Sequence, residues 1–319
     1  MTTLWDTTGT AVVKALAAER QRGGAVSSGL ALTLVVVADE KQVEAAEQAA
    51  TRAAAQHPCR LLLVVRRRPD APEPRLDAEV LIGGRLGPGE SVVMRMYGRL
   101  SLHAESVVLP LLAPDAPIVT WWCGPPPELI AHDPLGVFAH RRVTDCQAAG
   151  DPAAALAQRA ADYAPGDTDL SWARTTLWRG LCAAAFDSVE EAPQAVSVSG
   201  EPGNPSRALL SGWLAGRLNL PVDQVDSAGP GVTEVAFELA DGRLRLSRQD
   251  GRMATLFRTG QPDRVMPLPR RELGDLMAEE LRRLDADETY AAALASSTGR
   301  PPLPTDPVVR SHIWQDPTQ

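Results

Sequence analysis

The sequence has little of what marks membrane proteins, disulfide-rich proteins and zinc modules. Phe, Tyr and Trp together make up 4% of its 319 residues, so we expect an aliphatic core. The most apolar stretches, residues 30–38 and 106–122, are too short or too interrupted by proline to cross a bilayer. The four cysteines stand singly, without a C-x-x-C pair, which argues against a zinc site and favours reduced, buried thiols.

The charge of the chain argues against nucleic acid and anionic membranes as partners. The net charge is −8 and the isoelectric point is about 5.2. Nearly all positive charge is arginine, because Lys14 and Lys41 are the only lysines. The first residues show no basic leader followed by an apolar segment, so we expect a cytoplasmic protein.

Familiar catalytic motifs are also missing. The glycine cluster at 83–89 lacks the G-x-G-x-x-G spacing and the Lys-Ser/Thr ending of phosphate loops, and it predicts a hairpin connector. No G-x-S-x-G is present, and the five histidines form no metal-binding pair on a helix face. We therefore expect no cofactor and no metal, and His132 and His140 remain the candidates for acid–base chemistry.

The pattern of apolar residues predicts an α/β protein. A β-branched strand at 30–38, a helix at 39–58 and a strand at 59–67 make a βαβ unit with parallel strands. Strands at 75–84 and 91–100 add an antiparallel element, so the sheet should be mixed. Helices are expected from residue 7 to 22 and at 101–113, and a further strand at 116–122.

The second half of the chain predicts a smaller α+β domain. Its expected helices cover 151–164, 171–187, 204–218 and 270–295, and its strands cover 196–200, 232–242, 243–251 and 253–260. Asp-Gly pairs indicate tight turns and an antiparallel meander, which the 270–295 helix should cover. We predict a mixed-sheet domain at 1–165, an α+β domain at 166–300 and an extended or disordered tail at 301–319.

Three segments contain tryptophan, arginine or aspartate side chains that packing of an apolar core does not require. They are the tryptophan pair at 121–122, residues 133–146 and residues 171–187. Trp121 and Trp122 are neighbours at a strand end and must point to opposite faces, so we expect only one to enter the core easily. Tryptophan and arginine are enriched at binding hot spots, while a seam between domains is the alternative. The candidate partner-binding residues are Trp121, Trp122, Asp133, Arg141, Arg142, Asp145, Trp172, Arg174, Trp178, Arg179 and Asp187.

Five blocks of the sequence, in this order, resemble the glucose-6-phosphate dehydrogenase assembly proteins (OpcA) of actinobacteria and cyanobacteria. The blocks are the strand start HPCRLLLVV, in which the family commonly has serine at Cys59, SVVLPLLAPDAPIVTWW, DPLGVFAHRRVTD, the helix with W-x-R-x-x-x-W-R, and DETYAAALA. They are spread from about residue 57 to 294. We identify the resemblance as the actinobacterial type.

The resemblance implies a non-catalytic assembly factor or allosteric activator of glucose-6-phosphate dehydrogenase, which supports NADPH production in the oxidative pentose phosphate pathway. Thiol redox control, known in cyanobacterial relatives, is not carried over to these single cysteines. Two alternatives stay open. One is a phosphosugar sensor with Arg141, Arg142, Arg174 and Arg179 as anion ligands. The other is a phosphosugar-acting enzyme that uses His132 or His140.

Overall fold

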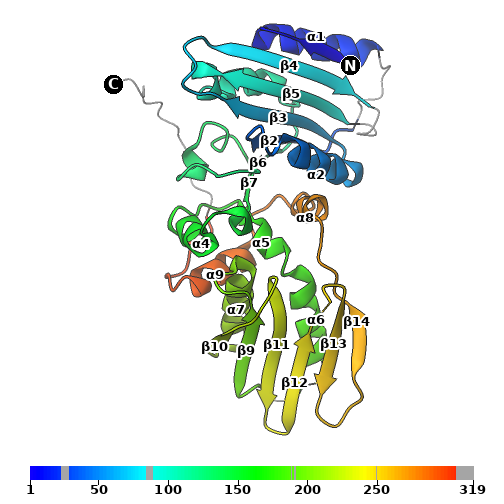
Figure 1. Ribbon diagram of the computed structural model, residues 1–319, viewed down its shortest axis with the longest axis vertical. Coiled ribbons are helices and arrows are strands. Elements are labelled where there is room, and N and C mark those ends of the chain that lie inside the picture. Colours follow the sequence, from blue (N-terminus) through cyan, green and yellow to red (C-terminus); the bar gives the residue numbers. More distant parts are fainter. Residues whose placement is uncertain (23–28, 84–88, 188, 190–191, 249, 307–319) are drawn as a thin grey trace. The chain divides into compact units, whose positions relative to one another are not determined.

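A computed structural model describes residues 1–22, 29–83, 89–187, 189, 192–248 and 250–306, and divides the chain into two compact units (Figure 1). The first unit comprises Met1–Thr144 and Glu272–Ala286, and the second comprises Asp145–Arg271 and Asp287–Asp306, where the described residues are concerned. No helix in these residues has the length and apolarity needed to span a bilayer.

The first unit is built on a mixed sheet. Its strands lie in the order β1-β4-β5-β3-β2-β6-β7; β4 is antiparallel to both of its neighbours and the other pairs are parallel. The elements are β1 (Thr2–Leu4), α1 (Gly9–Arg22), β2 (Leu32–Ala38), α2 (Val43–Gln56), β3 (Cys59–Arg67), β4 (Arg75–Ile82), β5 (Glu90–Tyr97), α3 (Glu105–Val108), β6 (Ile118–Trp122), β7 (Arg141–Thr144) and α8 (Leu273–Glu280). This confirms the predicted mixed sheet and its βαβ unit.

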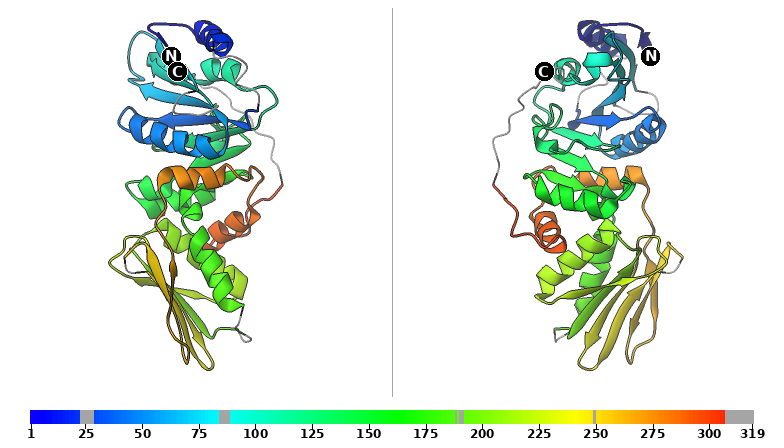
Figure 2. Two further views of the ribbon diagram at one scale, coloured as in Figure 1. Left: turned by 90° about the vertical axis from the view of Figure 1, so that its right-hand side faces the viewer. Right: turned by 60° about the vertical axis from the view of Figure 1, so that its left-hand side comes forward.

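The centre of this sheet is buried on both faces. Every residue of β2 is buried, as expected for a β-branched run between two covered faces. Alternate side chains of β2 and β3 join Val12 and Leu16 of α1 in one core cluster, and α2 packs against β2 and β3 (Figure 2). The sequence predicted the central strands correctly because β-branched apolar runs of this length are typical of strands that are buried on both faces.

The second unit pairs a six-stranded sheet with helices. The strand order is β10-β9-β11-β12-β13-β14, with β10 parallel to β9 and the remaining pairs antiparallel. The elements are α4 (Pro152–Ala161), β8 (Asp167–Asp169), α5 (Leu170–Ala173), α6 (Thr176–Phe186), β9 (Ala195–Gly200), α7 (Pro205–Leu218), β10 (Val222–Asp226), β11 (Val232–Leu239), β12 (Gly242–Ser247), β13 (Met253–Arg258), β14 (Arg264–Pro267) and α9 (Glu288–Ser297). The predicted meander is confirmed as β11 to β13.

Helices α6 and α7 cover this sheet. Trp178 and Cys182 of α6 and Leu210 of α7 share a core cluster with Val235 and Phe237 of the central strand β11. Leu239 pairs with Gly242, so Ala240 and Asp241 form the tight turn from β11 to β12, and Gly242 begins β12 with a φ of 146°. The sheet, α6 and α7 together position the pocket described below.

Several predicted elements need correction. The helix expected over 270–295 is two helices, because the side chain of Asp287 accepts a hydrogen bond from the Tyr290 amide and starts α9 anew. Helix α8 does not cover the meander; it packs on α2 in the first unit, and α9 packs on α7. The helix expected over 171–187 is interrupted between α5 and α6, and that expected at 101–113 contains only the four-residue α3. Strands β10 and β14 were not predicted.

The four cysteines are free thiols, of which Cys59, Cys146 and Cys182 are buried and Cys123 is half-buried. Burial raises the pKa of Cys59 and of Cys182 to about 12, so neither is a thiolate near neutral pH. Residues 301–306 have no regular secondary structure. The rest of the predicted tail and most of the 83–89 connector lie outside the described residues.

Candidate functional site

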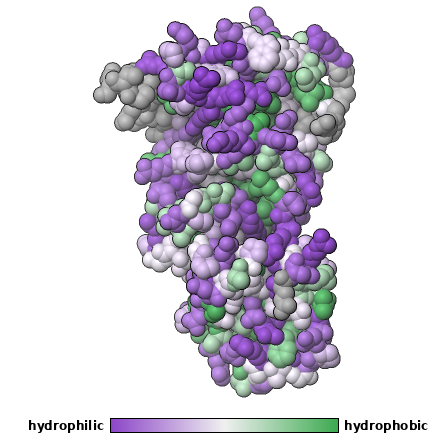
Figure 3. All heavy atoms as spheres, in the orientation of Figure 1, coloured by the Kyte–Doolittle hydropathy of each residue, from purple (hydrophilic) through white to green (hydrophobic). Residues whose placement is uncertain are grey.

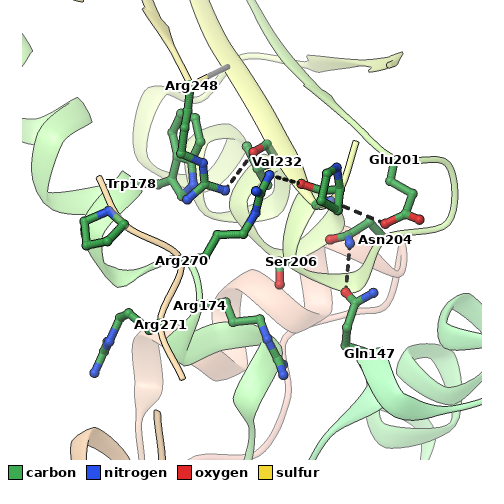
Figure 4. A pocket seen from close by; sticks show the side chains of 13 residues that line it. Gln147, Arg174, Trp178, Glu201, Asn204, Ser206, Val232, Arg248, Arg270 and Arg271 are labelled. Carbon is green, nitrogen blue, oxygen red and sulfur yellow. Dashed lines mark hydrogen bonds between the residues drawn. The ribbon is translucent and has the colours of Figure 1, made fainter. Parts of the chain in front are cut away.

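The second unit contains a polar pocket of about 240 Å³. It lies at the N-terminal end of α7, beside α6 and the start of β11 (Figure 4). Four arginines and one carboxylate line it, so its lining carries a positive charge. The lining residues are Gln147, Arg174, Trp178, Glu201, Asn204, Ser206, Pro230, Gly231, Val232, Arg248, Pro269, Arg270 and Arg271.

Arg174 follows α5 and is held by a carboxylate. Its Nη1 and Nη2 donate to the two oxygens of Asp145, each at 2.7 Å. Burial alone would lower the pKa of Arg174, but the hydrogen bonds and charge of Asp145 raise it above its ordinary value. This bidentate pair fixes one wall of the pocket and neutralises one of its four arginines.

Arg248 follows β12 and is buried without a carboxylate. Only 7% of its surface is exposed. Its Nη2 donates to the carbonyl of Val232 at 3.0 Å and its Nη1 to the carbonyl of Leu268 at 3.3 Å, and its Nε has no partner. Its Cζ lies 5.1 Å from the centre of the Trp178 ring. Burial, together with repulsion from Arg270, lowers the pKa of Arg248 to about 10, although the charge of nearby Asp250 acts in the opposite direction.

Arg270 and Arg271 come from the segment that follows β14. The Nη2 of Arg270 donates to the carbonyl of Pro230 at 2.8 Å, and its amide donates to the carbonyl of Gly251 at 2.9 Å. The one lining carboxylate, Glu201, accepts a hydrogen bond of 3.3 Å from the Gly231 amide. The arginines of the pocket therefore outnumber the acids around them.

The N-terminus of α7 completes the pocket. Asn204 caps this helix, since its Oδ1 accepts from the Arg207 amide at 3.1 Å and its Nδ2 donates to Gln147 at 2.7 Å. Pro205 occupies the first turn, where its missing amide is no loss. The positive end of the helix dipole therefore adds to the charge of the arginines.

Among the predicted residues of the first unit, Trp121 and Trp122 are 0% and 1% exposed. Trp122 joins the core cluster on one face of the sheet, and Trp121 is buried on the other. The expectation that only one tryptophan enters the core easily is wrong, because β6 is covered on both faces.

The charged residues predicted in the first unit have partners within that unit. Arg141 is paired with Glu280 of α8 and donates to the carbonyl of Asp285, and Arg142 donates to the carbonyl of Ala139. Asp133 accepts from the Leu135 amide at 2.9 Å and lies 3.7 Å from Arg66. His140 accepts from the Ile118 amide through Nδ1. The two arginines belong to the first unit, and neither lines the pocket of the second unit.

The remaining candidates lie on α5 and α6 or directly after them. The indole Nε1 of Trp172 donates to Asp287 at 2.8 Å, and the guanidinium of Arg179 stacks on the Trp172 ring at 3.6 Å. Trp178 is buried in the wall of the pocket, and Asp187 is exposed at the end of α6. Of the four predicted anion ligands, only Arg174 lines the pocket. The partner-binding role of all these residues stays a prediction.

Sequence reasoning missed Arg248, Arg270, Arg271 and Asn204. The Asn204-Pro205 pair is a readable helix start and could have marked one side of the pocket. Arg248 stands next to an Asp-Gly turn and resembles a solvated strand end in the sequence. Within the described residues, no group of three or more His, Cys, Asp or Glu side chains is arranged to hold a metal ion.

The fold and pocket define a two-unit α/β protein with an arginine-lined pocket. Two family models match the chain: the glucose-6-phosphate dehydrogenase subunit N-terminal domain at residues 50–161, and the corresponding C-terminal domain at 165–294. The chain belongs to the OpcA family that these two models describe. The models meet close to the predicted border at 165/166, while the compact units change at Thr144.

Two similar proteins add to this picture. A Synechococcus elongatus protein named OpcA, for the OxPP cycle, is 31% identical over 199 residues, which are 59% of this chain and 42% of that protein. The chain thus matches less than half of that relative's length. An oxidoreductase structure from Sinorhizobium meliloti has a TM-score of 0.50 at 11% identity and covers 84% of this chain and 95% of that one. This likeness shows the fold alone.

Proposed function

We propose that the chain is a non-catalytic partner of glucose-6-phosphate dehydrogenase in the cytoplasm, which assembles the active oligomer or activates it allosterically and so supports NADPH production in the oxidative pentose phosphate pathway. The observation that carries this proposal is the pair of family models, both named for domains of a dehydrogenase subunit, that together span most of residues 50–294. The cyanobacterial relative named for the OxPP cycle supports the same pathway.

The physical basis of activation is a shift of population. A partner that binds the active form of the dehydrogenase more tightly than the inactive form raises the fraction of active enzyme. The gain is limited by the ratio of the two affinities. The chain needs no catalytic group for this effect.

The solvent exposure of the predicted partner-binding residues indicates which of them can contact the partner directly. Asp187 is exposed and Arg179 is half-buried, and both lie on or at the end of α6. Trp121, Trp122 and Trp172 are at most 2% exposed, so we assign them a supporting role beneath the contact surface. On the face drawn in Figure 3, hydrophilic side chains dominate and hydrophobic ones form small patches. We therefore expect a contact in which charged side chains set orientation.

The proposal is tested by the rate of NADPH formation by the cognate dehydrogenase with and without the chain, together with the mass of the mixture by light scattering. A higher rate and a shared heavier species are expected. An unchanged rate with two separate masses would overturn the proposal for that enzyme.

The surface residues are tested by charge removal. Asp187→Asn should raise the concentration of chain needed for half-maximal activation by about twofold to tenfold. Asp223→Asn on the exposed strand β10 is the matched control and should leave activation unchanged. Equal effects of the two variants would remove Asp187 from the contact surface.

A further inference from the structure

We propose that the arginine-lined pocket of the second unit binds a small phosphorylated molecule, whose phosphate contacts Arg248 and Arg270 and whose hydroxyl-bearing part contacts the polar lining at α7. The chemical class is a phosphate monoester of a sugar or similar polyol. Figure 4 shows the side chains that would surround it.

The first argument is the buried charge of Arg248. A guanidinium that is only 7% exposed is costly unless an acid or other anion lies beside it. The described residues provide Arg248 with two backbone carbonyls, the Trp178 ring and the charge of exposed Asp250, which offsets its burial only in part, and its Nε has no acceptor. An anion in the pocket would supply both the missing charge and the missing acceptor.

The second argument is that two positively charged side chains, Arg248 and Arg270, lie close together in the pocket. Arg270 lies close enough to Arg248 to disfavour its charged form, and it too donates to a carbonyl, that of Pro230. Asp145 already neutralises Arg174, which leaves Glu201 as the one carboxylate of the lining. Among the described residues no acid forms an ion pair with either guanidinium, and Asp250 acts on Arg248 through its charge alone. Two such adjacent groups suit a phosphate, which offers several acceptor oxygens and up to two negative charges.

The third argument is the end of α7. Asn204 and Ser206 line the pocket at the N-terminus of this 14-residue helix, where amide groups and the helix dipole favour an anion. The N-terminus would not make a site alone, but here it faces the same pocket as the buried Arg248. Both features point to a ligand of the same sign.

The size and lining of the pocket indicate the rest of the ligand. A volume of about 240 Å³ suits a small metabolite better than a dinucleotide. Gln147, Asn204 and Glu201 offer both donors and acceptors to hydroxyl groups, and Trp178 gives an apolar wall. The anion class rests on this geometry, whereas the choice of glucose 6-phosphate as the first probe rests on the proposed function.

The test uses the full chain without any dehydrogenase. Inorganic phosphate, glucose 6-phosphate and glucose are titrated at constant ionic strength, and heat of binding and melting temperature are recorded. We expect glucose 6-phosphate to bind more tightly than phosphate, and glucose not to bind. Phosphate binding as tightly as the ester would restrict the site to free phosphate and overturn the sugar part. No binding of either at millimolar concentration would overturn the proposal, and would leave the activator role untouched.

Substitutions of the pocket arginines test whether glucose 6-phosphate binds in this pocket. Arg270 is exposed, so Arg270→Gln should keep the fold while weakening glucose 6-phosphate binding about tenfold or more. Arg264→Gln, on exposed strand β14 and outside the pocket, is the matched control and should bind as the wild type does. Arg248→Lys keeps the charge but loses the planar fork, and should also weaken binding. Wild-type affinity in both Arg270→Gln and Arg248→Lys would place the anion elsewhere.

Discussion

The first unit pairs its buried Arg60 and Arg141 with carboxylates, whereas the pocket of the second unit holds Arg248 and Arg270 by backbone carbonyls. In the first unit, Glu90 is fully buried and accepts from Arg20 at 2.6 and 2.8 Å and from Arg60 at 2.7 Å. Each of these hydrogen bonds joins a guanidinium to a negatively charged acceptor.

Arg248 and Arg270, unlike Arg174, form hydrogen bonds with uncharged acceptors. Arg248 donates to the carbonyls of Val232 and Leu268, and Arg270 to that of Pro230. A carbonyl accepts a hydrogen bond but carries no net charge, so the cost of burying the cation Arg248 is only partly offset. We infer that a buried arginine paired with an acid belongs to the framework, while one that has no acid pair and keeps an unsatisfied Nε, as Arg248 does, is a candidate for ligand binding.

The largest effect is expected for Glu90→Gln. This change leaves Arg60, whose side chain is 5% exposed, without its acid, and it also removes the partner of Arg20. We expect a loss of roughly 3–5 kcal/mol in the free energy of unfolding, measured by urea denaturation. The control is Glu79→Gln, a partner of Arg95 whose side chain is 36% exposed, which should cost at most about 1 kcal/mol. Similar losses in both variants would contradict the role of burial.

The pH dependence of the same pair tests its charge. Burial raises the pKa of Glu90, but the hydrogen bonds and charges of Arg20 and Arg60 outweigh it and hold the pKa below the ordinary 4.5. The carboxylate therefore stabilises the fold fully above pH 4.5, and this contribution is lost as the pH falls through the lowered pKa. The stability difference between wild type and Glu90→Gln should be constant near neutral pH and shrink in acid. A difference that grows in acid would contradict the assignment.

Part of the fold and little of the candidate site were readable from the sequence. The strands β2 and β3 followed from β-branched runs, and the hairpin at Gly242 from an Asp-Gly pair, since both signals are local. The apolar stripe of α8 showed that one face is buried, but not that this face meets α2 instead of the meander.

The pocket could not be predicted because its charges are assembled from distant segments. Arg248 becomes a buried cation only when Trp178, 70 positions earlier, packs beside it. Arg141 and Arg142, by contrast, looked like anion ligands in the sequence and have partners inside the first unit. Local composition shows that an arginine is present, while the folded partners decide whether its charge is balanced.

A smaller effect on stability is expected for Arg248→Gln. Glutamine can still donate to one carbonyl, and the change removes a buried charge without leaving an acid behind. We expect the unfolding free energy to fall by about 1 kcal/mol or less, measured by urea denaturation in the absence of phosphate. Arg174→Gln, which leaves Asp145 buried without its partner, should cost more. A loss for Arg248→Gln as large as that for Glu90→Gln would show that the fold itself balances this cation.

The smallest effect is expected for Arg52→Gln, which breaks an ion pair that is exposed to solvent. Arg52 on α2 contacts Asp275 of α8 at 2.7 and 2.8 Å, with 55% of its side chain exposed. The hydrogen-bond distances are close to those between Arg20 and Glu90, but water can solvate the Asp275 carboxylate that the change leaves behind, so we expect a loss of about 0.5 kcal/mol. The contact between α2 and α8 should persist, because His57 also hydrogen-bonds to the carbonyl of Ala278 at 2.9 Å. Urea denaturation checks this expectation, and a loss of about 3 kcal/mol would mean that geometry, and not burial, separates framework pairs from the rest.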